Sequence, residues 1–168
     1  MTFPNYMDFV DARGQLEFAA PHDNFIKDCT VQSRLTSCLG TAVSCVNSTD
    51  LLKIFKFNKH DNRDYTGDYY MSTYKCTTAY SYITSNYNCL TTADHLSKDA
   101  ITKCFSDMLT SSEDKMCEAG NTLIQCLDAI YSSYCGPKAA DFVCNVAKID
   151  MTYDIPQCAD KIMKCNPL

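Results

Sequence analysis

Apolar residues recur at a helical period along most of this chain. In residues 23–43 they fall three and four positions apart, so they share one broad face of a helix. The same interval predicts further helices over residues 51–55, 69–84, 92–109 and 111–135. Residues 58–68 are polar and contain Gly67, so we predict a long loop there. The pattern predicts an all-α protein.

Two signals at the end of the strongest helix sharpen this prediction. Gly136 directly follows the last residue of the helical pattern. Glycine has no Cβ, so it readily adopts the left-handed conformation that ends many helices. Pro137 fits the first turn of a helix, so it opens the next one. A last short helix is predicted over residues 157–164, after Pro156.

The first 22 residues follow a different pattern. They alternate loosely between apolar and polar positions and end near Pro21, which predicts a short extended arm. We therefore predict an N-terminal arm over residues 1–22 and one domain over residues 23–168. The fold class expected is an all-α, disulfide-rich bundle of five to seven helices.

Twelve cysteines are spread through the chain, an even number that predicts six disulfides. They are Cys29, Cys38, Cys45, Cys76, Cys89, Cys104, Cys117, Cys126, Cys135, Cys144, Cys158 and Cys165. Disulfides persist in oxidising compartments, so we expect a secreted, extracellular protein whose signal peptide has been removed. Zinc sites need cysteines in close pairs, and no pair here has fewer than six intervening residues.

Three of these cysteines lie on the strongest predicted helix. Cys117, Cys126 and Cys135 are nine positions apart, which places successive thiols about half a turn out of phase at about 100° per residue. They must therefore face different neighbours. We expect them to link this helix to at least two others.

Charge and hydropathy limit the kinds of binding partner that we expect. The net charge is −5, which repels nucleic-acid phosphates and anionic lipid. The sequence has no run of 18 apolar residues, so no membrane span is expected. Asn47-Ser48-Thr49 matches the glycosylation motif, and we take Asn47 as a candidate sugar acceptor.

The sequence has no catalytic motif, so we expect no enzyme activity and no cofactor. It contains no G-x-S-x-G, no H-E-x-x-H and no glycine-rich phosphate loop. His60-Asp61 lacks the cysteines that flank this pair in secreted phospholipases, which favours a solvated loop histidine. A calcium loop starting at Asn62 would have Thr73 where a bidentate glutamate is required.

Tyrosines are concentrated in the middle of the chain. Tyr65, Tyr69, Tyr70, Tyr74 and Tyr80 form the candidate binding residues. Tyrosine offers a rigid contact area with a polar tip, as recognition surfaces require. The alternative is that these rings pack a helix against the core, since some lie four positions apart.

One run of the sequence resembles a known family. Between residues 117 and 144 it contains Cys117, Cys126-Leu127, Cys135-Gly136, Ala139-Ala140, Phe142 and Cys144. This run resembles the C-terminal half of nematode secreted cysteine-rich domains of unknown function, including those of chondroitin-proteoglycan-like proteins. The resemblance implies an extracellular helical domain without enzyme activity.

Taken together, these patterns predict a secreted, disulfide-stapled module that acts by binding or as a structural element outside cells. Its expected partner is an extracellular protein or glycan. The alternative is a carrier that holds lipid or another small apolar ligand in an internal cavity.

Overall fold

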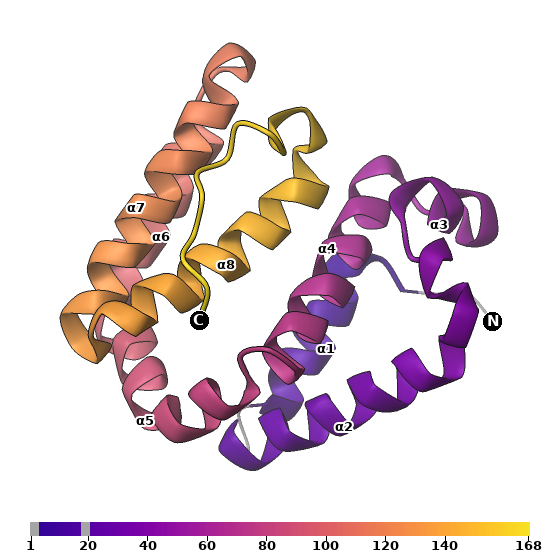
Figure 1. Cartoon of the computed structure of the whole chain (residues 1–168). Helices are drawn as coiled ribbons and strands as arrows, with labels where there is room; N and C mark the ends of the chain where they lie inside the picture. The colour runs from indigo at the N-terminus through magenta and orange to yellow at the C-terminus, as the bar shows by residue number, and fades with distance from the viewer. Residues whose placement is uncertain (1–3, 18–20) are drawn as a thin grey trace. The chain divides into compact units, whose positions relative to one another are not determined.

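The computed structural model describes residues 4–17 and 21–168, and these residues are all-helical, with eight α-helices and three short 3₁₀ segments. The α-helices are α1 (Tyr6–Glu17), α2 (Pro21–Leu39), α3 (Ser48–Phe55), α4 (Lys59–Cys76), α5 (Tyr80–Leu96), α6 (Lys98–Leu109), α7 (Met116–Cys135) and α8 (Pro137–Asp154). The 3₁₀ segments are η1 (Gly40–Cys45), η2 (Glu113–Lys115) and η3 (Pro156–Cys158). The all-α prediction is confirmed, with one more helix than the expected maximum (Figure 1).

The chain divides into two compact units, residues 1–77 and residues 78–168. The first contains α1 to α4 and the second α5 to α8. The boundary falls between α4 and α5, inside the stretch 69–84 that the periodicity predicts as one helix. That prediction is wrong, because Thr77 leaves helical geometry and a new helix starts at Tyr80.

In the first unit, α2 and α4 pack along one another. A disulfide joins Cys29 of α2 to Cys76 of α4. Gln32 donates its amide to the Tyr69 carbonyl and to the Thr73 hydroxyl, at 3.3 and 2.9 Å. Polar side chains therefore supply much of the contact between these two helices.

The predicted extended arm is wrong, because residues 6–17 form α1. This helix packs on α2 and α4 within the first unit. Arg13 donates two hydrogen bonds to the Asp68 carboxylate of α4, at 2.8 and 2.9 Å, and its guanidinium lies 5.1 Å from the Phe9 ring centre. Helices with weak periodicity depend on such tertiary contacts, so the sequence pattern alone did not reveal α1.

The predicted loop over residues 58–68 is also wrong, because it forms the first half of α4. Asn58 caps the helix by accepting hydrogen bonds from the backbone amides of His60 and Asp61, both at 2.9 Å. Asn62 and Thr66 are buried, and the Thr66 hydroxyl donates to the Asn62 carbonyl at 2.7 Å. A polar segment is thus helical and partly internal.

In the second unit, α7 is the central helix and packs against α5, α6 and α8 (Figure 1). Its three cysteines bond to three different elements: Cys117 to Cys158 of η3, Cys126 to Cys104 of α6, and Cys135 to Cys89 of α5. The expectation that this helix is linked to at least two others is confirmed. Gly136 ends α7 with φ of +80°, and Pro137 opens α8, as predicted.

The C-terminal segment after η3 runs back over α7 and α8. A disulfide joins Cys165 to Cys144 of α8. Asn121 of α7 accepts from the Met163 amide and donates to the Lys161 carbonyl, at 2.7 and 3.1 Å. The short helix predicted over residues 157–164 is replaced by η3 and irregular chain, which these contacts hold in place.

The structure contains five disulfides, one fewer than predicted. Cys38 and Cys45 are free and exposed. The first unit holds four cysteines, and Cys29 and Cys76 bond to each other across the α2–α4 contact. A disulfide needs two Cβ atoms about 4 Å apart, which packed helices provide and an exposed helix face does not.

The close approach of α7 to α8 gives the first prediction. A Cβ on Gly120 would lie 3.0 Å from Sδ of Met151 and 3.4 Å from Cδ1 of Ile162. Gly120→Val should lower the free energy of unfolding by about 2 kcal/mol, because the branched side chain overpacks this contact. Urea denaturation without reductant measures this loss, and a valine variant as stable as the wild type would show that the contact is loose. Gly120→Ala is the milder control, since the Met151 side chain is flexible.

Candidate functional site

Four of the five candidate tyrosines lie on α4 of the first unit, and Tyr69 among them is buried. Tyr69 is 7% exposed, and its hydroxyl lies 3.1 Å from that of Thr36. Tyr70 packs edge-on against Tyr69, with ring centres 5.2 Å apart, and Tyr74 is half-buried in the same helix. Tyr80 belongs to the second unit.

Tyr65 also has a packing role. Its ring stacks on Phe57 at 4.9 Å and meets Tyr6 edge-on at 5.2 Å. Its hydroxyl donates to the Pro4 carbonyl at 3.1 Å. Burial, followed by the charge of Asp61, raises the pKa of this phenol. These contacts favour the core-packing alternative for Tyr65 and Tyr69.

The exposed apolar residues of the first unit include a group that the sequence reasoning missed. Leu52, Ile54 and Phe55 lie on α3, are 42%, 59% and 41% exposed, and are flanked by Lys53 and Lys56. We call these five residues the α3 surface. The sequence does contain a signal for this surface, because residues 51–60 have three lysines and no acidic residue. The net charge of −5 for the whole chain does not reveal this local excess of positive charge.

Local sequence fixes both ends of α3. The Asn47 side chain accepts from the backbone amides of Thr49 and Asp50, at 3.1 and 2.9 Å, and so begins the helix. Lys56 ends it in the left-handed conformation, with φ of +56°. No residue of α3 is buried. The helix therefore presents its side chains at the molecular surface.

Asp50 is the acidic group beside this surface. A hydrogen bond from Asn47 lowers the pKa of Asp50, and one from Lys53 lowers it further. The Lys53 ammonium lies 3.3 Å from the Asp50 carboxylate. Both groups are exposed enough for solvent to screen this pair, so the cationic end of Lys53 stays available.

Asn47, the candidate glycosylation site, uses its side-chain amide within the fold. Its Nδ2 donates to the Ser44 carbonyl at 2.9 Å and to the Asp50 carboxylate at 2.8 Å. A sugar on Nδ2 would replace at least one of these bonds. Glycosylation at Asn47 stays a prediction.

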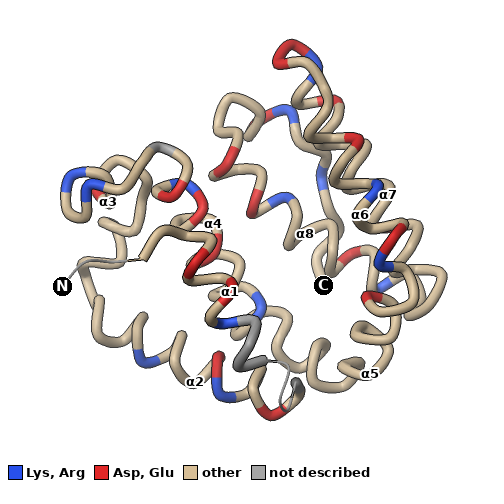
Figure 2. Tube along the Cα trace, turned by 180° about the vertical axis from the view of Figure 1, so that it is seen from behind, with Lys and Arg blue, Asp and Glu red and all other residues tan. Residues whose placement is uncertain are grey.

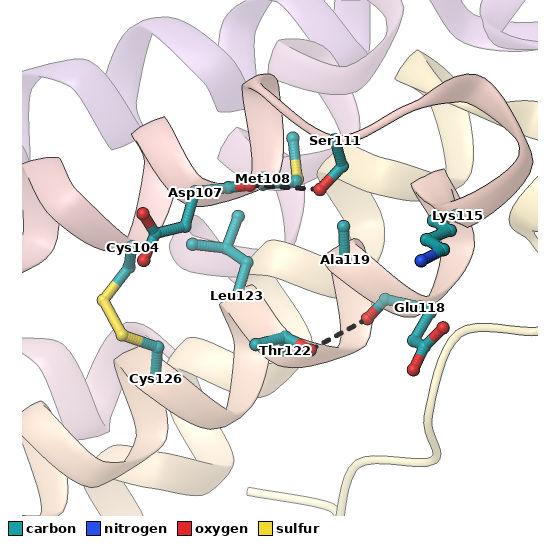
Figure 3. Close-up of a pocket in the computed structure, with 10 residues that line it drawn as sticks. All are labelled: Cys104, Asp107, Met108, Ser111, Lys115, Glu118, Ala119, Thr122, Leu123 and Cys126. Carbon is teal, nitrogen blue, oxygen red and sulfur yellow. Dashed lines mark hydrogen bonds between the residues drawn. A yellow bond between two sulfur atoms is a disulfide. The ribbon is translucent and has the colours of Figure 1, made fainter.

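The second unit has a cavity of about 240 Å³ between α6 and α7. The Cys104–Cys126 disulfide lies at one end, and Lys115 and Glu118 lie at the other (Figure 3). The remaining lining residues are Asp107, Met108, Ser111, Ala119, Thr122 and Leu123. Its wall therefore mixes charged and apolar groups.

This cavity suits an apolar carrier poorly. Pockets that enclose a small apolar ligand have volumes of roughly 300–1,000 Å³ and mostly apolar walls. Asp107, Lys115 and Glu118 would have to give up hydration to bind such a ligand. The carrier alternative gains no support from this cavity.

A group of polar residues lies elsewhere in the second unit, around Asp128 of α7. Burial raises the pKa of Asp128 to about 6, and the charge of Asp141 on α8 contributes. Its Oδ1 atom is buried without a hydrogen-bond partner, as is the hydroxyl of Tyr82. Burial and then Asp141 also raise the pKa of Tyr82. Asp128, Asp141 and Tyr82 do not line the α6–α7 cavity. A substrate bound in that cavity would therefore not contact them.

Within residues 4–17 and 21–168, no helix combines the length and apolar character needed to cross a bilayer. No group of three or more histidine, cysteine or acidic side chains in those residues is arranged to hold a metal ion.

The free thiols give a prediction on oxidation state. Five disulfides remove two hydrogens each, so the intact protein should weigh about ten hydrogens less than its reduced form. Iodoacetamide should then label Cys38 and Cys45 alone, and peptide mass spectrometry identifies the labelled sites. A loss of twelve hydrogens with no labelling would show instead that these two cysteines are bonded.

Asp128 gives a prediction on pH. Its pKa is raised from about 3.9 in the unfolded chain, so the folded state loses stability as pH rises from about 4 to about 6. Asp128→Asn should therefore raise the free energy of unfolding by about 1 kcal/mol at neutral pH, after allowing for solvent screening, and change it little near pH 4. Denaturation at both pH values measures the difference. Asp160→Asn, at an exposed position, is the control, and an equal effect of both variants would contradict the assignment.

Comparison with known proteins does not extend this picture. No protein-family model, curated protein or solved structure matches the chain. The likeness of residues 117–144 to nematode secreted domains therefore stays a prediction from those residues.

Proposed function

We propose that this protein is a secreted, disulfide-stapled module that binds an extracellular partner through its surface. The observation that carries the proposal is the α3 surface, where large apolar side chains stand exposed together on one short helix. Ile54 is 59% exposed. Apolar side chains grouped in this way mark interaction sites more often than scattered ones do.

The disulfides support the extracellular part of the proposal. Ten of the twelve cysteines are bonded in the structure, and such bonds indicate an oxidising compartment. The resemblance of residues 117–144 to secreted domains points the same way. Four of the five bonds lie in the second unit.

A surface mode of action fits the observed groups better than the alternatives do. The α6–α7 cavity is small and partly charged. The acidic pair Asp128 and Asp141 lies outside that cavity, so a substrate held there would not meet it. The α3 surface needs neither a larger cavity nor a nearby acidic pair, because a partner can contact its exposed side chains directly.

Binding to intact cells tests the proposal. The oxidised protein, labelled with a fluorophore, should bind the outer cell surface saturably, and Ile54→Ser should weaken that binding about tenfold because an apolar contact is lost. Flow cytometry measures the titration. Leu109→Ser is the matched control, since Leu109 is 71% exposed on α6 of the other unit. Equal losses in both variants, or no saturable binding, would contradict the proposal.

A further inference from the structure

We propose that the α3 surface docks on an anionic lipid bilayer, with its apolar side chains entering the interface and its lysines contacting lipid phosphates and carboxylates. This inference rests on the proposed function and names the partner of the same surface. It concerns a helix lying on a membrane, which requires no spanning segment.

The apolar side of α3 is wide and partly exposed. At about 100° per residue, Leu51 and Phe55 mark the centre of the apolar arc, and Leu52 and Ile54 mark its two edges. Leu52, Ile54 and Phe55 are all exposed, and Leu51 is only half-buried. The helix packs on α4, and the Phe55 ring stacks on Phe57 at 5.3 Å, yet much of the Leu52, Ile54 and Phe55 surface stays exposed. An interfacial helix has this division between an apolar face and a charged one.

The charge beside this face is positive on balance, since Lys53 and Lys56 outnumber Asp50, the acidic residue of α3, which lies 3.3 Å from the Lys53 ammonium. Residues 51–60 contain Lys53, Lys56 and Lys59 and no acidic residue. Figure 2 shows blue lysine segments beside the α3 label. Electrostatic attraction at physiological salt acts over about 8 Å, so a docked surface responds to Lys53, Lys56 and Asp50 more than to distant acidic residues. The local charge therefore complements an anionic bilayer that the net charge alone would repel.

The two most exposed leucines among the described residues, Leu96 and Leu109, have acidic neighbours in sequence. Leu96 and Leu109 are more exposed than Ile54, at 64% and 71%. In sequence, Leu96 lies between Asp94 and Asp99, and Leu109 follows Asp107. Acidic groups would oppose an approach to anionic lipid at both places.

The same charges argue against a second copy of the chain as the occupant. A symmetric dimer through this face would bring Lys53 and Lys56 toward their own counterparts. Like charges brought together in an interface are unfavourable. An anionic surface instead neutralises them, and a bilayer can also accept side chains that line no groove.

Co-sedimentation with large unilamellar vesicles tests this inference. The oxidised full chain should bind vesicles of phosphatidylcholine mixed with phosphatidylserine at least tenfold more strongly than vesicles of phosphatidylcholine alone, and high salt should weaken this binding. Ile54→Ser should reduce the partition coefficient about tenfold. The double variant Lys53→Gln/Lys56→Gln should also reduce it about tenfold.

Matched variants in the second unit are the controls. Leu109→Ser and the double variant Lys161→Gln/Lys164→Gln change exposed residues of the same types, and both should bind the anionic vesicles like the wild type. Circular dichroism and thermal melting check that every variant is folded. The two lysine replacements keep the apolar residues intact, so they test the charge even if Ile54→Ser is unstable.

Several outcomes would overturn the inference. These are no binding to either vesicle, equal binding to both, or equal losses in the α3 and control variants. Light scattering that shows a dimer abolished by Ile54→Ser would assign the surface to a second copy. Saturable cell binding that depends on Ile54 without any vesicle binding would reject the lipid partner and leave the proposed function standing, whereas vesicle binding that Ile54→Ser leaves unchanged would count against both.

Discussion

The disulfides that radiate from α7 determine how the second unit is built. Cys117, Cys126 and Cys135 stand about half a turn apart in succession, so one helix bonds to elements on several sides. The α8 helix needs no such bond to α7, because Gly120 lets the two helices come close at Met151. In the usual chain-entropy account, each loop closed by a disulfide contributes about 3 to 4 kcal/mol by restricting the unfolded chain. The same unit also holds most of the buried apolar residues, among them Ile124 and Phe142.

The first unit has a different balance of forces. It has one disulfide, and its helices meet through polar contacts such as the Gln32 amide on Thr73 and the paired hydrogen bonds between Arg13 and Asp68. Aromatic rings around Tyr65 join α1 to α4. The α3 helix packs on α4, and none of its residues is buried, so a partner can reach its exposed side chains.

The two units differ in what they contribute to the proposed function. The second unit holds four of the five disulfides, and the first carries exposed apolar and basic groups together on α3. The net charge of −5 describes the chain as a whole, whereas docking depends on the charges within a few ångströms of the contact. The proposed lipid partner follows from that local arrangement at Ile54, Lys53 and Lys56.

The sequence by itself determined the helical class, the cross-linking role of α7 and the junction at Gly136 and Pro137. These features depend on local periodicity, cysteine spacing and the backbone preference of single residues. Only the tertiary structure decided that residues 58–68 are helical, that residues 6–17 form α1 and that Cys38 and Cys45 lack a partner. It also decided which apolar residues are exposed, Ile54 on α3 rather than Tyr69 on α4. Burial and disulfide pairing depend on which distant segments pack together, and a local pattern does not contain that information.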